Sequence, residues 1–318
     1  MRFKNWTLPY SITYILVWFT KQGFFRRVTR QGLSNIPKNK PVIFAANHQN
    51  SLIDPIVIAT TNRYPVFFLT KSDVFKNPTI AKILYALNML PIYRERDGSD
   101  FMEKNKAIFN RCSEILEGNG RIIIFPEGSH NSKNRLRQLK KGIARIAIQA
   151  DKNTQEDIWI VPVGLNYTNT KNKCADLFLS YGKAINASEL FRENTNATIE
   201  NELTNPLMEK ISDGLRNEML DYKDDNFYEL SEFLISKIKR QRTSLKARYI
   251  WDKTKSEKLN AFISSHGNEA KEMQKQTIEL EEVWKEPLQS EFPQNKRIWS
   301  TTDMNNWESG STKIICLV

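Results

Sequence analysis

Short apolar runs alternate with longer amphipathic stretches through the middle of this 318-residue chain. The apolar runs are typical of buried strands, and they predict strands at residues 41–46, 66–70, 90–93, 121–125, 158–165 and 177–181. The stretches between them predict helices at about residues 51–60, 78–87, 101–117 and 141–150. Such alternation indicates an α/β domain, which we place at residues 31–195.

The chain before this domain has a different pattern. Residues 1–30 combine aromatic and basic side chains and contain no Asp or Glu. This mixture is typical of helices at a lipid–water boundary, although apolar helices more often pack on a core. The longest apolar stretch, residues 10–19, is shorter than the about 20 residues that span a bilayer, and no signal-peptide cleavage pattern follows it. We expect membrane-interface helices at residues 1–30.

The chain after this domain is polar. From about residue 196 it is rich in Glu, Lys, Asn and Gln, with apolar residues at helical spacing. This pattern predicts a helical extension over residues 196–285. Residues 286–318 have no regular pattern and predict an irregular tail.

The formal net charge of +11 indicates an anionic partner: nucleic acid, an anionic membrane, or a phosphorylated substrate. No zinc-finger ligand set or aromatic RNA-binding signature is present, which favours membrane and phosphate over nucleic acid. Cys112, Cys174 and Cys316 are far apart and form no Cys-x-x-Cys. Neither a disulfide framework nor a metal site is expected.

His48 and Asp54 lie directly after the first predicted strand, where ligands bind in open α/β sheets. A histidine held by a carboxylate is a suitable general base for activating a hydroxyl. If this motif stood alone, a purely structural role would be equally probable, in which His48 caps a loop and Asp54 caps a helix. Ser51 lies between them, but no Gly-x-Ser-x-Gly elbow is present, which disfavours an acyl-enzyme and a serine esterase.

Further charged residues follow the other predicted strands. Glu127 and Gly128 end one strand, and a carboxylate there can bind substrate hydroxyls. The basic residues near strand exits or a helix start are Lys71, Arg94, Arg96, Lys140 and Lys141. Guanidinium groups and helix N-termini suit phosphate oxygens, so these cations together predict an anion site, although each alone is more typical of a solvated surface.

Four segments, taken in order, resemble the glycerolipid acyltransferase family, which includes glycerol-3-phosphate and 1-acylglycerol-3-phosphate acyltransferases. The first is Asn47-His48, then five residues, then Asp54. The others are Pro91-Ile92-Tyr93-Arg94-Glu95-Arg96, Phe125-Pro126-Glu127-Gly128-Ser129 and Ile160-Val161-Pro162-Val163. The usual family spacing between the histidine and the aspartate is four residues. A subset that resembles glycerol-3-phosphate acyltransferases and bacterial paralogues has five.

The resemblance implies a mixed β-sheet flanked by helices. It also implies that His48 deprotonates a glycerol hydroxyl, which attacks the thioester of acyl-CoA or acyl-carrier protein, and that Asp54 orients His48. Arg94, Arg96 and Lys140 or Lys141 would hold the acceptor phosphate, and Glu127 the glycerol. No metal or bound cofactor is implied, because the acyl carrier is a co-substrate.

The first acceptor that we expect is 1-acylglycerol-3-phosphate, acylated at sn-2 to phosphatidate in phospholipid synthesis. Glycerol-3-phosphate, acylated at sn-1, and an amino-acid lipid are alternatives. A non-catalytic lipid-binding protein on the same fold is the alternative of another class, disfavoured because His48, Asp54 and Glu127 are all present. The expected location is the cytoplasmic face of a membrane, with peripheral attachment.

Overall fold

The computed structural model describes residues 7–61, 64–168, 175–193, 200–237 and 244–285. The chain divides into two compact units, residues 1–220 and 221–318, and each is described by itself. Within the described helices, no segment combines the length and apolar character that a membrane span requires.

The first unit is built on one mixed sheet of eight strands. Its strands are β1 (Arg27–Gln31), β2 (Val42–Ala46), β3 (Phe67–Lys71), β4 (Met89–Ile92), β5 (Arg121–Ile124), β6 (Trp159–Tyr167), β7 (Asp176–Tyr181) and β8 (Ile185–Asn186). The order across the sheet is β1-β7-β6-β2-β5-β3-β4, with β8 paired to β6. Strands β6, β2, β5, β3 and β4 run parallel, and β7 is antiparallel to β6. The expected mixed sheet is confirmed.

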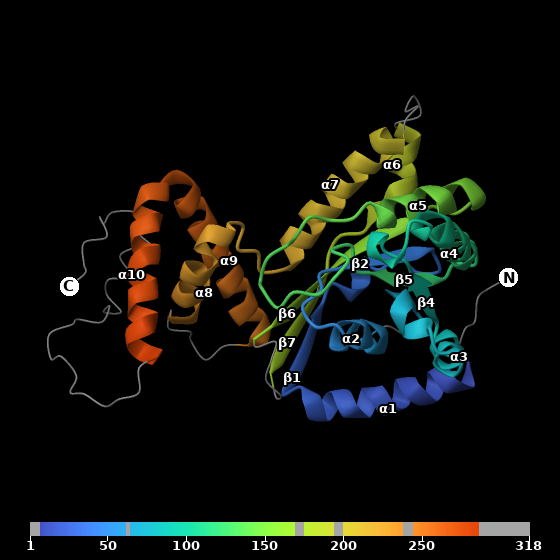
Figure 1. Ribbon diagram of the computed structural model, residues 1–318, viewed down its shortest axis with the longest axis horizontal. Coiled ribbons are helices and arrows are strands. Elements are labelled where there is room, and N and C mark those ends of the chain that lie inside the picture. Colours follow the sequence, from blue (N-terminus) through green and yellow to red (C-terminus); the bar gives the residue numbers. More distant parts are fainter. Residues whose placement is uncertain (1–6, 62–63, 169–174, 194–199, 238–243, 286–318) are drawn as a thin grey trace, which may run out of the picture. The chain divides into compact units, whose positions relative to one another are not determined.

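Helices cover both faces of this sheet (Figure 1). On one face lie α1 (Leu8–Phe24) and α2 (Ile53–Thr61), which share a core with β2, β6 and β7. On the other lie α4 (Phe101–Glu117), α5 (Gly142–Asn153), α6 (Ala187–Glu193) and α7 (Glu200–Glu218). The short helix α3 (Pro78–Ala86) leads into β4. Every residue of β2 is buried, so the strand that leads to His48 lies in the interior of the unit.

The predicted strands and helices of residues 41–181 are found, with ends shifted by up to three residues. Strands β1 and β8 were not expected. Residues 27–30 were expected to belong to a helical segment, and this was wrong, because β1 pairs with β7 there. The sequence of β1 combines two exposed arginines, Arg27 and Arg30, with half-buried residues and therefore lacks the apolar run that reveals an inner strand.

The boundary of the first unit lies after α7, at Leu220, rather than near residue 195. The composition changes at 195, but Leu207, Ile211 and Leu215 of α7 pack into the same core as α5. The second unit contains α8 (Tyr228–Lys237), α9 (Leu245–Ser265) and α10 (Gly267–Lys285), as the helical pattern predicted. Its own small core includes Phe227, Leu230 and Leu259. The expected tail, residues 286–318, lies outside the described residues.

Candidate active site

His48 leaves the central strand β2 and faces Asp54 at the start of α2. The Nδ1 atom of His48 lies 2.9 Å from Oδ2 of Asp54. Since a carboxylate only accepts hydrogen bonds, Nδ1 carries the proton and Nε2 is the basic nitrogen. The side chain of Asp54 is fully buried, while 13% of the His48 side chain is exposed. The pair that the sequence predicted is therefore assembled, with one imidazole nitrogen left for a substrate.

The loop between His48 and Asp54 accommodates the fifth intervening residue. The same Oδ2 atom of Asp54 accepts the backbone N–H groups of Gln49, at 2.7 Å, and Asn50, at 2.8 Å. The side chain of Asn50 accepts the N–H groups of Leu52 and Ile53 and so caps the beginning of α2. The loop winds around the carboxylate, and Asp54 keeps its direction toward His48. Ser51 lies on the exposed side of this loop.

Glu127 holds the backbone at His48 from the neighbouring strand. Its Oε1 atom accepts the N–H of His48 at 3.0 Å, and its Oε2 atom accepts Nε–H of Arg137 at 3.0 Å. Burial raises the pKa of Glu127 above its ordinary value, against the opposing effects of Arg137 and the His48 amide. Gly128 turns the chain with a φ of +76°, a conformation that suits glycine.

Two aromatic rings flank the imidazole. Phe125 stacks on His48 with ring centroids 4.0 Å apart, and His130 meets it edge-on at 5.9 Å. The backbone N–H of Asn131 donates to the carbonyl of His48 at 2.8 Å. The segment after β5 therefore forms one wall of the site and limits the movement of the His48 ring.

Sequence reasoning did not identify Tyr167 or Arg137. The hydroxyl of Tyr167, at the end of β6, donates to Oδ1 of Asp54, and burial beside this carboxylate raises the pKa of Tyr167 well above its ordinary value. The predicted strand ended at residue 165, two positions too early for Tyr167 to be noticed at a strand exit. Arg137 lies among several basic residues of a loop, and no local signal distinguishes it.

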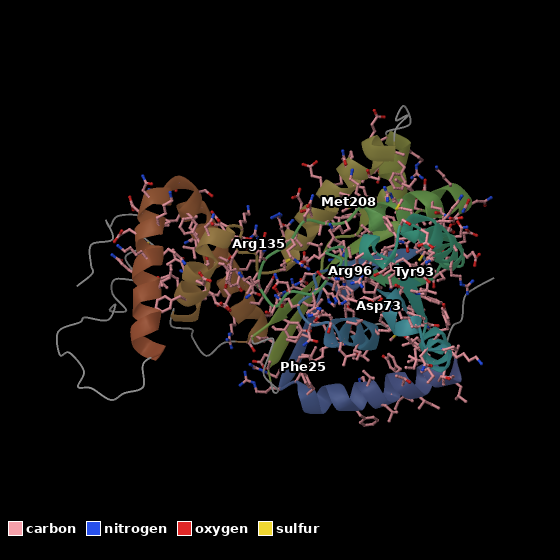
Figure 2. The ribbon with its side chains drawn as sticks, in the orientation of Figure 1. Phe25, Asp73, Tyr93, Arg96, Arg135 and Met208 are labelled. Carbon is pink, nitrogen blue, oxygen red and sulfur yellow. The ribbon has the colours of Figure 1, made fainter. Side chains whose placement is uncertain are left out.

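The predicted cations lie along the same sheet edge but differ in their surroundings. The guanidinium of Arg94 lies 3.1 Å from Asp73 and 3.6 Å from Asp97. Hydrogen bonds from the Arg94 backbone and Ser72 lower the pKa of Asp97. Arg96 lies in the 3-10 turn Glu95–Asp97 and is exposed, and among the described side chains no carboxylate pairs with it. Figure 2 labels Arg96 in the same region as Asp73 and Tyr93.

Lys71 and Lys140 are both exposed at this edge, Lys71 at the end of β3. The backbone N–H of Lys140 donates to the carbonyl of Pro126 at 2.7 Å, which places Lys140 beside the Glu127 turn. Lys141 follows at the N-cap position of α5. Strands β2, β5, β3 and β4 are consecutive, so at about 4.8 Å per strand the exit of β4 lies roughly 14 Å from that of β2.

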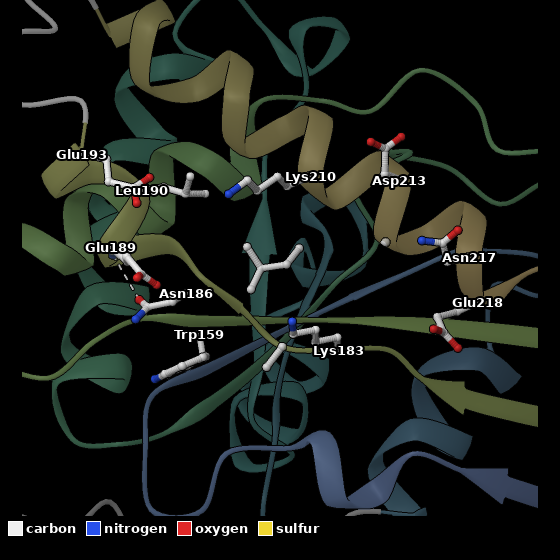
Figure 3. Close-up of a pocket in the computed structure, with 13 residues that line it drawn as sticks. Trp159, Lys183, Asn186, Glu189, Leu190, Glu193, Lys210, Asp213, Asn217 and Glu218 are labelled. Carbon is white, nitrogen blue, oxygen red and sulfur yellow. Dashed lines mark hydrogen bonds between the residues drawn. The ribbon is translucent and has the colours of Figure 1, made fainter.

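A cavity of about 670 Å³ lies elsewhere, between α6, α7 and the start of β6 (Figure 3). None of the predicted site residues lines it. Its Trp159 is level with Val42, at the opposite end of the parallel strands from His48. Among the described residues, no cluster of three or more His, Cys, Asp or Glu side chains is arranged to hold a metal ion.

Comparisons with known proteins identify a family and several similar proteins. Residues 27–166, from β1 almost to the end of β6, match the family model described as Acyltransferase. The glycerol-3-phosphate O-acyltransferase 1 of Saccharomyces cerevisiae is 22% identical in a match that covers 65% of this chain and 39% of that protein. The 1-acyl-sn-glycerol-3-phosphate acyltransferase of Borreliella burgdorferi is 29% identical over 138 residues, 43% of this chain and 50% of that protein.

A crystal structure of the 1-acyl-sn-glycerophosphate acyltransferase of Thermotoga maritima aligns with a TM-score of 0.43 and 22% identity, over 63% of this chain and 77% of that one. The chain spans half or less of the length of these two curated relatives. The family match includes His48, Asp54, Arg94, Arg96 and Glu127. Residues 27–166 form a domain of the acyltransferase family, as the order of the motifs predicted.

Proposed function

We propose that this chain is a glycerolipid O-acyltransferase that transfers a fatty acyl group to the sn-2 hydroxyl of 1-acylglycerol-3-phosphate. The donor is a thioester, acyl-CoA or acyl-carrier protein, and the product is phosphatidate. The observation that carries this proposal is the His48–Asp54 pair at the exit of β2, inside the residues that match the family. The two curated relatives, named for acylation of glycerol-3-phosphate and its 1-acyl ester, support the choice of acceptor class.

The chemistry follows from the orientation of the imidazole. Nε2 of His48 accepts the hydroxyl proton as the acceptor oxygen forms a bond to the thioester carbonyl carbon. The tetrahedral intermediate then collapses, the C–S bond breaks, and the leaving thiolate takes the proton from His48. Asp54 stabilises the imidazolium between these two steps. The acyl carrier is a co-substrate, and the proposal assigns no step to a metal or bound cofactor.

The phosphate of the acceptor would lie toward the exits of β3 and β4. Lys71 and Arg96 are exposed cations there, and the exposed Lys140 and Lys141 lie beside the Glu127 turn that follows β5, the strand next to β3. The distance between the exits of β2 and β4 is roughly 14 Å. A glycerol phosphate and an arginine side chain together can bridge this distance. Arg94 contributes by holding the turn, since its guanidinium faces two carboxylates.

Glu127 and Gly128 border the glycerol end of this space. Both carboxylate oxygens of Glu127 already accept a donor, from His48 and from Arg137. We therefore propose that Glu127 acts on the acceptor mainly by fixing the backbone at His48. The turn at Gly128 is exposed and offers its backbone to the acceptor.

Glycerol-3-phosphate is the second candidate acceptor, with acylation at sn-1. Two observations favour it: the five-residue spacing between His48 and Asp54, and the long match to a relative named for this reaction. Because both acceptors present a hydroxyl near a phosphate, the same site residues serve either reaction.

We also propose that the protein attaches to the cytoplasmic face of a membrane through α1. One side of α1 is fixed to the domain: the hydroxyl of Tyr10 accepts the N–H of Val66, and that of Tyr14 donates to the carbonyl of Thr60. The other side carries Leu8, Ile12, Ile15, Leu16 and Phe19, each 50–75% exposed. A helix with a large exposed apolar side suits the lipid–water boundary, where acceptor and acyl chain are found.

The exposed apolar surface continues onto α3. The hydroxyl of Thr7 donates to the carbonyl of Ala86 at 2.9 Å and joins the two helices. Ile80 and Ile83 of α3 are also exposed. Since α3 connects β3 to β4, this surface lies beside the strand that ends at Lys71 and the strand that precedes Arg96.

Acyl transfer by the purified protein tests the proposed reaction. We expect transfer from acyl-CoA or acyl-carrier protein to 1-acylglycerol-3-phosphate, measured in parallel with glycerol-3-phosphate. His48→Ala should lower kcat by at least about 10³-fold, since it removes the general base. His266→Ala, in α9's C-terminal cap outside the family match, should retain wild-type activity. Full activity of a folded His48→Ala variant would contradict the mechanism.

A further inference from the structure

Asp54 receives four hydrogen bonds, and they come from two different parts of the fold. Oδ2 accepts N–H groups from His48, Gln49 and Asn50, which all belong to the loop after β2. Oδ1 accepts only the hydroxyl of Tyr167, which ends β6. The three loop donors belong to the same loop as His48. They therefore cannot by themselves fix the position of the His48–Asp54 pair relative to the sheet. Tyr167 is the described contact to this carboxylate that comes from outside the loop.

Strand β6 is a rigid reference for this contact. It lies between β2 and β7 in the sheet, and all but its first residue are buried. The same strand holds the beginning of the loop: the side chain of Asn47 accepts the N–H of Leu165 at 2.7 Å and donates to its carbonyl at 3.1 Å. These two anchors, Leu165 and Tyr167, lie two positions apart along β6. The loop is thus tied to the strand at its root and at its carboxylate.

We propose that Tyr167 is a positioning residue for the acyltransfer reaction, whose hydroxyl holds the Asp54 carboxylate against β6 and keeps Oδ2 directed at Nδ1 of His48. The aspartate in turn keeps Nε2 turned toward the acceptor hydroxyl. Such outer partners of a catalytic group fix its orientation, and removing them weakens the reaction without removing the chemistry. The kinetic part of this inference rests on the proposed function.

Burial supports a fixed donor role for the hydroxyl. The phenol of Tyr167 is buried against Phe25, with ring centroids 6.1 Å apart. Its raised pKa keeps the hydroxyl protonated at neutral pH, so it donates to Asp54 there. Asp54, Glu127 and His130 are titratable side chains that contact His48, and Tyr167 acts on His48 through Asp54.

Tyr167→Phe removes one oxygen and keeps the ring, so it tests the hydrogen bond with little change in packing. We expect kcat to fall about tenfold with the acceptor KM nearly unchanged. The acidic limb of the pH–kcat profile should move to higher pH. The reason is that a carboxylate with one donor fewer stabilises the protonated imidazole more strongly.

Tyr181→Phe is the matched control. Tyr181 is a buried tyrosine on the neighbouring strand β7, and its hydroxyl contacts Oγ1 of Thr61 rather than Asp54. Its substitution should lower the melting temperature by an amount similar to Tyr167→Phe and leave kcat and the pH profile unchanged. If Tyr167→Phe behaves like this control, the hydroxyl is merely structural and the inference is overturned.

A double-mutant cycle tests whether Tyr167 acts through Asp54. Asp54→Asn lowers kcat on its own, and adding Tyr167→Phe should then cause little further loss, because the interaction is already disrupted. Losses in kcat that multiply independently would contradict the proposed route.

Nuclear magnetic resonance supplies a readout that does not depend on turnover. The chain contains three histidines, so the His48 ring signal can be assigned with His48→Ala. In Tyr167→Phe its titration midpoint should move to higher pH, and in Tyr181→Phe it should not. If the wild-type protein transfers no acyl group, the proposed function fails, whereas this titration still decides whether Tyr167 controls the His48–Asp54 pair. An unmoved midpoint overturns the inference.

Discussion

At the scale of single residues, two arginines with the same charge, Arg94 and Arg96, have different neighbours. Arg94 and Arg96 lie two positions apart in the segment that follows β4. The guanidinium of Arg94 faces Asp73 and Asp97, and these carboxylates offset its charge. Arg96 is exposed on the same turn. We therefore propose that the phosphate-binding role that the motif implies for both falls mainly on Arg96, while Arg94 stabilises the turn that presents it.

This division of roles predicts different defects. Arg96→Ala should raise the acceptor KM about tenfold with little change in melting temperature, because a charge-assisted phosphate contact contributes about 1.5–3 kcal/mol. Arg94→Ala should instead destabilise the protein by about 1 kcal/mol, since it removes the ion pairs with Asp73 and Asp97. Steady-state kinetics and thermal unfolding distinguish them.

Arg111→Ala is a control for loss of a positive charge, because Arg111 pairs with Glu114 on the exposed face of α4. It should change neither quantity appreciably. An equal rise in KM for Arg94→Ala and Arg96→Ala, with no loss of stability in either, would show that both bind the phosphate directly.

At the scale of elements, the two sides of helix α1 have different surroundings. Its inner side carries Tyr10 and Tyr14, whose hydroxyl groups form hydrogen bonds with backbone groups of α2 and of the residue before β3. Its outer side is apolar and exposed. At the end of the helix, Arg26 and Arg27 bind the buried carboxylate of Asp176, whose pKa is well below its ordinary value because of these two partners. The helix is thus fastened at both ends while its outer face stays uncovered.

The outer face of α1 should therefore control lipid binding. Leu16→Glu is expected to weaken sedimentation with anionic phospholipid vesicles at least about tenfold, since burial of one large apolar side chain contributes about 1.5–3 kcal/mol. The melting temperature should not change, because Leu16 is exposed.

Met102→Glu is the matched control, with an exposed apolar residue on α4, which covers the other face of the sheet. It introduces the same charge and should leave vesicle binding intact. Equal loss of binding in both variants would point to net charge rather than to the outer face of α1.

At the scale of the whole molecule, the family match and the two structural units do not coincide. The match ends at residue 166, and the first unit continues to Leu220 through β7, β8, α6 and α7. The second unit has its own core around Leu230, which is 1% exposed. Separate cores predict that each unit can be destabilised by a substitution in its own interior.

Leu230→Ala tests this independence. The cavity should destabilise the second unit by about 2–4 kcal/mol. Hydrogen exchange measured by mass spectrometry should show faster exchange in α8, α9 and α10, with β2, β5 and β6 still protected. Ile122→Ala, in the fully buried strand β5, should give the reverse pattern. Faster exchange throughout the chain in both variants would indicate one cooperative unit.

Local pattern alone determined much of this protein. Buried strands of parallel sheets are short apolar runs, so their positions, and the polar residues directly after them, can be read from the chain. That is why His48, Asp54, Glu127, Arg94 and Arg96 were identified before the fold. The sequence likewise predicted an α/β domain and the helical character of the C-terminal region.

Only the tertiary structure decided which of these side chains meet, because contacts between strands depend on sheet order rather than chain order. Tyr167 lies 113 positions after Asp54 and contacts it because β6 is the neighbour of β2. Asp73 meets Arg94 because β3 lies beside β4. The burial of α7, and the edge strand β1 with its polar sequence, depend in the same way on partners that are distant along the chain.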